Sequence, residues 1–148
     1  MTTDDSSIFL ETTFNSSIEK VWEAWTNPNL IMNWFGSDPE GKGLKAELDV
    51  RQGGYFEITF QDSDLTEHTC SGIYDEVRIL SKLTFSWRWK SEPGVESFIT
   101  LLLTPEGNST NMQFEHKNPG SGSKHDYAKG WQNTFLKLER LLGIQTEC

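Results

Sequence analysis

The sequence lacks any continuous apolar run of about 18 residues, the length that a membrane-spanning helix needs. We therefore expect no membrane span. The first residues also lack the basic start and apolar core of a signal peptide, so we expect no leader. Cysteine is scarce, with only Cys70 and Cys148 in the chain. Two cysteines exclude a disulfide framework and are typical of a reducing compartment, which predicts a cytoplasmic protein.

Basic side chains are also few. The 148 residues contain 13 Lys and Arg against 22 Asp and Glu, which gives a net charge of −9. Phosphate backbones and anionic membranes bind clustered basic groups, so this balance argues against nucleic acid and membrane surfaces as partners.

Patterns typical of metal and catalytic sites are missing. His68-x-Cys70 places two metal ligands on one strand face and His116 is a distant third, whereas zinc needs three or four convergent ligands. Cys70 as a nucleophile would need one of these histidines as its base, and no oxyanion signature accompanies it. By the alternation along the strands, carboxylates such as Glu57 and Glu115 point away from the core. A pair of inward carboxylates that could act as general acid and base is therefore missing. The sequence thus predicts no catalytic residue, no metal and no cofactor.

Aromatic residues, in contrast, are plentiful at 12% of the chain, and residues 18–36 hold three of the six tryptophans. This stretch predicts two short helices, because Asn27 can cap a second helix that Pro28 begins. Ser16-x-x-Glu19 predicts a capping box for the first helix, and Gly36 a left-handed C-cap for the second. The apolar residues that recur at helical spacing are Ile18, Val21, Trp22, Trp25, Leu30, Ile31, Trp34 and Phe35.

The rest of the chain predicts strands and one long helix. Residues 8–14 read as a first strand, and six further segments between 44 and 116 alternate apolar with polar side chains and are separated by turns. The alternation slips near Glu76-Val77, which predicts a β-bulge. A helix with an apolar stripe follows and ends near Gly143. This order predicts one α+β domain over residues 1–148, with an antiparallel sheet and helices on one face.

The order and the motifs together resemble the helix-grip, START-like (SRPBCC) superfamily, and within it the branch named for the activator of the 90-kDa heat-shock protein's ATPase. The resemblance runs over essentially the whole chain. The residues that carry it are Val21-Trp22-x-Ala24-Trp25-Thr26-x-Pro28, Trp34-Phe35-Gly36, Asp49-Val50-Arg51-x-Gly53-Gly54, Gly72-Ile73-Tyr74-Asp75-Glu76-Val77, Leu83-Thr84-Phe85-Ser86-Trp87, Leu103-Thr104-Pro105-Glu106-Gly107, Thr110, His116 and Gly130-Trp131.

The resemblance implies a curved six- or seven-stranded antiparallel sheet that wraps around a long C-terminal helix, with two short helices after the first strand. It also implies an apolar cavity between the sheet and that helix. Members bind hydrophobic ligands, cyclise polyketides or act as protein-interaction modules. Three functions follow as alternatives: non-enzymatic binding of a small hydrophobic or aromatic ligand, which we favour; a module that binds a chaperone or a second copy of the chain; and a cyclase- or hydrolase-like enzyme.

Strand parity selects the candidate ligand-binding residues, because alternate side chains face the same side of a sheet. His68, Cys70, Tyr74 and His116 are the polar members, and each either orients a ligand or has a backbone or water partner. We expect Trp34 and Phe35, at the end of the second helix, to form a movable rim over the cavity. The apolar and aromatic candidates are Phe56, Ile58, Phe60, Phe85, Trp87, Ile99, Leu101, Met112 and Phe114 from the strands, and Tyr127, Trp131 and Phe135 from the last helix.

Overall fold

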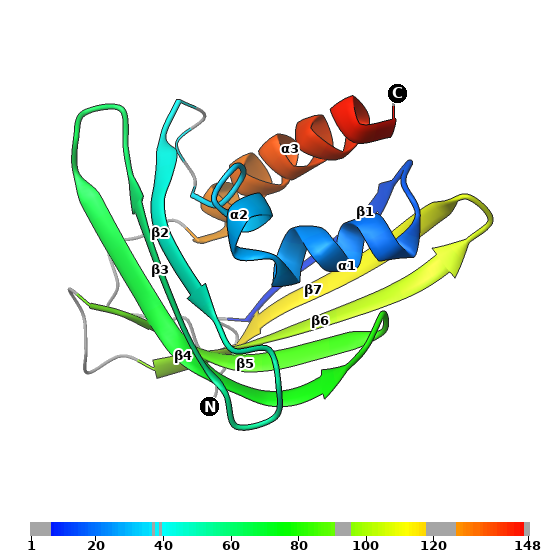
Figure 1. Ribbon diagram of the computed structural model, residues 1–148, viewed down its shortest axis with the longest axis horizontal. Coiled ribbons are helices and arrows are strands. Elements are labelled where there is room, and N and C mark those ends of the chain that lie inside the picture. Colours follow the sequence, from blue (N-terminus) through cyan, green and yellow to red (C-terminus); the bar gives the residue numbers. More distant parts are fainter. Residues whose placement is uncertain (1–6, 37, 39, 91–95, 118–126, 147–148) are drawn as a thin grey trace.

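The computed structural model describes residues 7–36, 38, 40–90, 96–117 and 127–146, the helical residues 127–128 and 143–146 by their backbone alone. Figure 1 shows the elements in chain order. They are β1 (Ile8–Phe14), α1 (Ile18–Thr26), α2 (Pro28–Ile31), β2 (Lys42–Leu48), β3 (Tyr55–Gln61), β4 (Glu67–Arg78), β5 (Lys82–Trp89), β6 (Glu96–Glu106), β7 (Ser109–Lys117) and α3 (Tyr127–Thr146).

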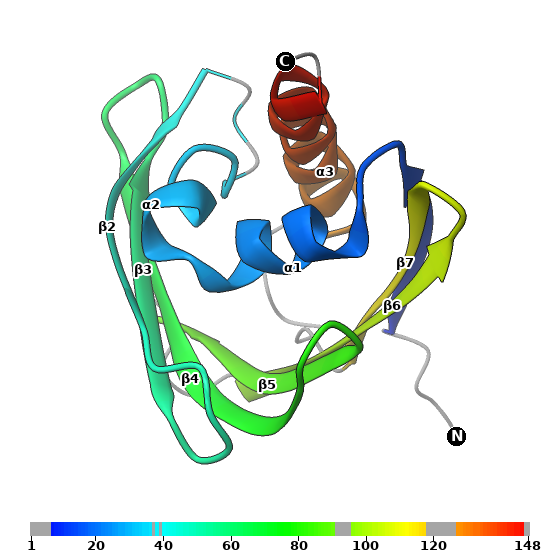
Figure 2. The ribbon, with the colours of Figure 1, turned by 45° about the vertical axis from the view of Figure 1, so that its right-hand side comes forward.

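The strands form one seven-stranded antiparallel sheet in the order β1-β7-β6-β5-β4-β3-β2. β1 and β2 are therefore its two edges. The sheet curls into a trough that holds α3, while α1 and α2 lie across one end of its concave side (Figures 1 and 2). This arrangement confirms the helix-grip fold that the motif order predicted.

Alternation along the strands explains which face is buried. In β3, Phe56 and Ile58 are buried, whereas Tyr55 on the opposite face is 48% exposed. The predicted bulge is present, since the β4–β5 register shifts between Tyr74 and Glu76. A second register shift lies between Gly43 and Lys45, at the β2 edge.

The helix caps follow the sequence with three corrections. Asn27 caps the start of α2, with its side chain accepting from the Asn29 N–H. α2 ends at Ile31 with Met32 as its C-cap, so the predicted C-cap at Gly36 is wrong, although Gly36 has the positive φ of 114° that favours glycine. The cap of α1 is Ser17 rather than Ser16. α3 continues past Gly143 to Thr146, so the predicted C-cap at that glycine is wrong.

Candidate functional site

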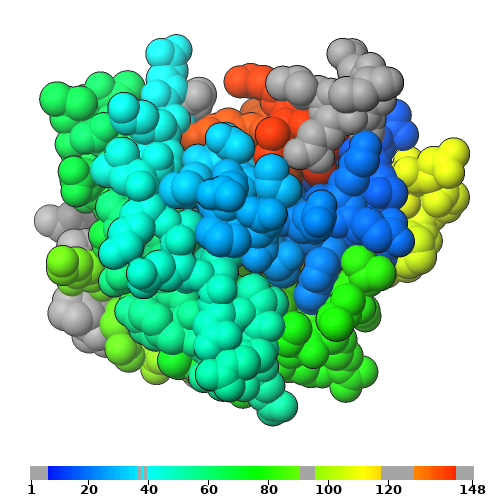
Figure 3. All heavy atoms as spheres, viewed as in Figure 1, coloured from blue at the N-terminus to red at the C-terminus, as the bar shows by residue number. Residues whose placement is uncertain are grey.

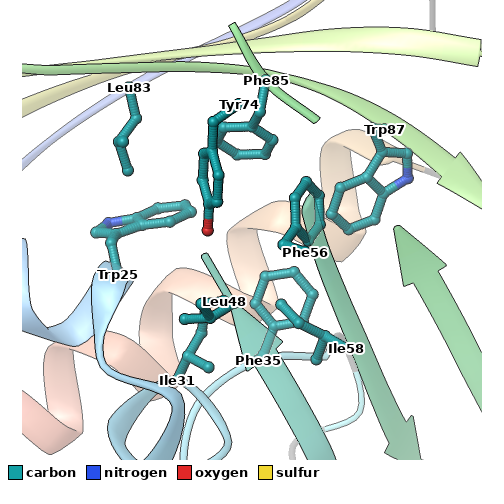
Figure 4. Close-up of a pocket in the computed structure, with 10 residues that line it drawn as sticks. All are labelled: Trp25, Ile31, Phe35, Leu48, Phe56, Ile58, Tyr74, Leu83, Phe85 and Trp87. Atoms are coloured by element: carbon teal, nitrogen blue, oxygen red, sulfur yellow. The ribbon is translucent and has the colours of Figure 1, made fainter. Parts of the chain in front are cut away.

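An aromatic-lined cavity lies on the concave side of the sheet, beneath α1 and α2 (Figure 4). Its volume is about 20 Å³, which is room for about one water molecule. Its lining consists of Trp25, Ile31, Phe35, Leu48, Phe56, Ile58, Tyr74, Leu83, Phe85 and Trp87.

This cavity is a different one from the cavity that we expected between the sheet and the last helix. The lining comes from β2, β3, β4 and β5, from α1 and α2, and from the residues just after α2. Among the described side chains, none of α3 lines it. Figure 3 shows the atoms of α1, α2 and β2 side by side across this face of the molecule. Each of the three elements contributes a lining residue, namely Trp25, Ile31 and Leu48.

Aromatic rings hold one another in place around the cavity. The Phe56 ring lies 5.3 Å from that of Phe85 and 5.4 Å from that of Tyr74, and the first pair is T-shaped at 84°. On the helical side, the Phe35 ring lies 5.7 Å from that of Trp87. Each such pair contributes about 0.5–1.5 kcal/mol to stability beyond the burial of its surface. These contacts keep the aromatic side chains of the wall in place.

Tyr74 supplies the polar group of this lining. Its hydroxyl points toward the centre of the cavity in Figure 4. No hydrogen bond joins that hydroxyl to another described residue. Burial raises the pKa of Tyr74 above its ordinary value, so the phenol stays neutral and can donate a hydrogen bond.

Two indoles of the lining also carry unpaired donors. The Nε1 atoms of Trp25 and Trp87 are buried and have no hydrogen-bond partner among the described residues. In Figure 4 both nitrogens lie at the ends of their rings that are turned away from the Tyr74 hydroxyl. The rings therefore present carbon atoms to the cavity, and Tyr74 alone presents a polar atom at its centre.

His116 lies on β7, outside the lining, with both ring nitrogens hydrogen-bonded. The Trp131 indole N–H donates to Nδ1 over 3.0 Å, and Nε2 lies 2.7 Å from Ser97 Oγ. Because an indole nitrogen only donates, Nδ1 must be the unprotonated nitrogen, and Nε2–H donates to Ser97. Burial lowers the pKa of His116 to about 3. The histidine is thus neutral and joins the sheet to α3.

His68 and Cys70 share a face of β4, as predicted, but neither lines the cavity. His68 Nε2 lies 2.7 Å from Asp62 Oδ2, and the imidazole packs against Phe60 and Trp89. Cys70 is fully buried, and burial raises the pKa of its thiol well above the ordinary value. A neutral, buried thiol is a poor nucleophile.

The other candidates divide between the cavity and the core. Trp34 is fully buried and donates its indole N–H to the Ala24 carbonyl over 3.0 Å, so it is a core residue of the helix pair and not a rim. The side chain of Tyr127 lies outside the described residues. Those in the lining are Phe56, Ile58, Tyr74, Phe85 and Trp87. Those buried elsewhere are Phe60, Ile99, Leu101, Met112, Phe114, Trp131 and Phe135.

Sequence reasoning placed Phe35 at the rim of the cavity and missed Trp25, Ile31, Leu48 and Leu83 as lining residues. Each of them lay on a predicted apolar face, but periodicity identifies a face and does not show which of its members surround an unfilled space.

A buried lysine was missed as well. Lys137 of α3 is only 9% exposed, and its Nζ donates to the Gly36 and Asp38 carbonyls over 3.0 and 2.8 Å. Burial lowers the pKa of Lys137. This side chain fastens the segment after α2 to the last helix. Its position on the buried side of a helix with an apolar stripe was the available signal.

Within the described ranges, no three His, Cys, Asp or Glu side chains form a group that could hold a metal ion. None of the described helices is long and apolar enough to cross a membrane.

Residues 15–143 match the family model described as activator of Hsp90 ATPase homolog 1-like protein. No curated protein matches the chain. Among solved structures, a protein from Nitrosomonas europaea is 23% identical with a TM-score of 0.82, over 99% of this chain and 100% of that one. An AHSA1-like protein from Aeromonas hydrophila is 20% identical with a TM-score of 0.80, over 95% and 94%.

DynU16, a protein in the dynemicin biosynthetic locus, is 21% identical with a TM-score of 0.77; the match covers 95% of this chain and 48% of that one. At these identities the structural likenesses show the fold. The family model covers most of the chain, and the chain therefore belongs to the family of activator of Hsp90 ATPase homolog 1-like proteins.

Proposed function

We propose that this protein binds a small, largely aromatic molecule that carries one hydrogen-bonding group, in the cavity beneath α1 and α2. The observation that carries the proposal is the Tyr74 hydroxyl, which is turned into an otherwise apolar space and has no partner among the described residues. A hydroxyl that faces an apolar space without a protein partner can donate to an acceptor on a ligand, and this hydrogen bond would favour binding.

The cavity must enlarge to hold such a molecule, since about 20 Å³ is far below the 300 Å³ or more of ordinary ligand sites. The sheet side of the lining is fixed by strand pairing. The opposite side includes Ile31 of α2 and the nearby Phe35, and α2 has only four residues. A helix of one turn has little stability of its own. We therefore expect α2 to move outward when the ligand enters.

Binding ranks ahead of catalysis because the cavity lacks a reactive pair. Cys70, His68 and His116 all lie outside the lining, and the cysteine and His116 are buried and neutral. The lining thus offers shape, aromatic surface and one hydroxyl, which suit a carrier or sensor of a small molecule better than a cyclase- or hydrolase-like enzyme.

The test is a thermal-shift series with aromatic probes of increasing size, such as phenol, acetophenone, 2-naphthol and 2-acetylnaphthalene, beside naphthalene without a polar group. We expect the polar probes to raise the melting temperature of the wild-type protein. Tyr74→Phe should weaken their binding about 3- to 10-fold, as loss of one hydrogen bond predicts, and leave naphthalene unaffected.

Tyr55→Phe is the matched control, because Tyr55 is 48% exposed on the opposite face of the sheet. Its probe affinities should equal those of the wild type. If no probe stabilises the wild-type protein, or if Tyr74→Phe and Tyr55→Phe bind all probes alike, the proposal is wrong.

A further inference from the structure

A second, larger hollow lies between the edge strand β1 and the helix α3. Its volume is about 340 Å³, within the range of ordinary binding sites. It is separate from the aromatic cavity, since the two share no lining residue. We call it the β1–α3 groove, and its lining consists of Leu10, Glu11, Thr12, Gln132, Phe135, Leu136 and Glu139.

The two edges of the sheet differ in how they discourage pairing with another strand. The β2 edge carries Lys42 and Lys45 and has a register shift between Gly43 and Lys45. Lysines and bulges are common devices that protect an edge strand. β1 has none of these: its sequence IFLETTF contains no lysine or proline, and its seven residues pair with β7 without a break. The β1 edge is thus the one open to a further strand.

Among the described residues, no strand pairs with β1 on the side away from β7. Alternate residues of an edge strand direct their N–H and C=O groups outward. Apart from the β7 ladder, no hydrogen bond joins the β1 backbone to another described residue. An extended backbone can pair with such a row of groups in sequence, whereas a helix cannot, because its own backbone groups are already paired.

One face of α3 forms the helical wall of the groove, and a strand with alternating side chains could contact it. Gln132, Phe135, Leu136 and Glu139 lie at i, i+3, i+4 and i+7, so they form one face of α3. Leu136 is 59% exposed. Leu10 supplies further apolar surface from β1.

The charge of the lining is of one sign. Glu11 and Glu139 are acidic, and the lining contains no basic side chain. Glu11 Oε2 already accepts from the Asn111 and Gln113 side-chain amides of β7, so Glu139 is the carboxylate to which a basic side chain would bind. The whole chain carries a net charge of −9. A segment that lies here is therefore favoured if it carries Lys or Arg.

We propose that an extended segment of a partner protein, with alternating apolar side chains and at least one Lys or Arg, adds to the free edge of β1 and lies in the β1–α3 groove. Main-chain pairing with β1 supplies affinity, the contact with Leu136 selects the apolar positions, and Glu139 selects the basic one.

The test begins with selection of a random dodecapeptide phage library on the full chain. Peptides with the alternating basic pattern should be enriched. When synthesised, they should slow hydrogen exchange of β1 backbone amides, which a side-chain contact alone would not do. Leu136→Arg should weaken their binding at least tenfold, about 1.4 kcal/mol, and Glu139→Gln should weaken binding less, mainly at low salt.

Ile79→Arg is the matched control, because Ile79 is a 75% exposed apolar residue between β4 and β5. It should bind the peptides as the wild type does. The proposal is wrong if no peptide is enriched, if the enriched peptides bind Leu136→Arg equally well, or if β1 exchange is unchanged. It is also wrong if the protein sediments as a dimer that Leu136→Arg dissociates, since a second copy would then cover the groove.

Discussion

Two buried polar side chains, His116 and Tyr74, differ in whether their polar atoms have hydrogen-bond partners. His116 is fully buried and gives both ring nitrogens to partners, Trp131 and Ser97. Tyr74 is 3% exposed and its hydroxyl has no partner among the described residues. A satisfied group stabilises the fold, whereas an unsatisfied one is a place where a ligand can contribute. The difference between them distinguishes a structural polar residue from a candidate binding residue.

His116 should make the protein sensitive to acid. In the unfolded chain a histidine binds a proton below about pH 6.5, but His116 in the folded protein does so only near pH 3. Between these values the unfolded state holds more protons, so the free energy of unfolding falls as the pH falls, by up to about 1.4 kcal/mol per pH unit from this residue.

The variant His116→Gln tests this, because an amide can still accept from Trp131 and donate to Ser97. Urea denaturation at pH 7.5, 6.5, 5.5 and 4.5 should show a steeper loss for the wild type than for His116→Gln. His68→Gln, which keeps His116, should retain the wild-type steepness. Parallel losses in all three proteins would contradict the assignment.

At the scale of elements, α2 and the segment that follows it depend on contacts with distant parts of the chain. α2 is one turn long, and Lys137 from α3 holds the Gly36 and Asp38 carbonyls. Phe35, which lines the cavity, directly precedes this anchored segment. The hydrogen bonds of Lys137 thus oppose the outward movement of α2 that the proposed ligand requires.

Lys137→Met should therefore have two effects. It keeps the apolar stem but leaves two carbonyls without their donor, which should lower the free energy of unfolding by about 1–3 kcal/mol. It should also speed the entry of 2-acetylnaphthalene, measured by stopped-flow quenching of tryptophan fluorescence. Lys45→Met, which removes only an exposed contact of 3.9 Å with Glu47, should change neither quantity. If Lys137→Met were destabilised but bound the probe at the wild-type rate, α2 would not be the entry route.

The elements were largely predictable from the sequence because their signals are local. Alternation located the strands, Asn27-Pro28 located the start of α2, and the slip near Glu76 located the bulge. The register shift at Gly43 was not foreseen, since one glycine in a short edge strand gives no comparable slip.

The candidate site was less predictable because it depends on contacts between distant segments. Lys137 donates a hydrogen bond to Gly36, which lies 101 positions earlier in the chain. A periodic pattern within one segment cannot predict a contact between such distant residues. Parity placed Tyr74 correctly on the inner face, but it placed His116 there equally, and only the partners of each group separate their roles.

At the scale of the whole molecule, the curved sheet encloses a buried core, and we expect a reagent to reach it only through unfolding. Cys70 is the natural probe of this property. It is fully buried on β4, where its register partners are Ile58 of β3 and Trp89 of β5. It lies outside the lining of the aromatic cavity, so movement of α2 alone should not expose its sulfur.

In a Cys148→Ser background, labelling of Cys70 with a thiol reagent should therefore report global unfolding. The free energy obtained from the labelling rate should agree with that from urea denaturation to within about 1 kcal/mol. Adding 2-acetylnaphthalene should slow labelling by the factor 1 + [L]/Kd, because a ligand that binds only the folded state lowers the unfolded population. A cysteine introduced as Ser81→Cys, in a chain without Cys70 and Cys148, is the exposed control and should react at once, with or without the probe. If Cys70 reacted much faster than unfolding allows, or if the probe accelerated its reaction, the cavity would open by separation of the strands, and the sheet rather than α2 would be the moving part.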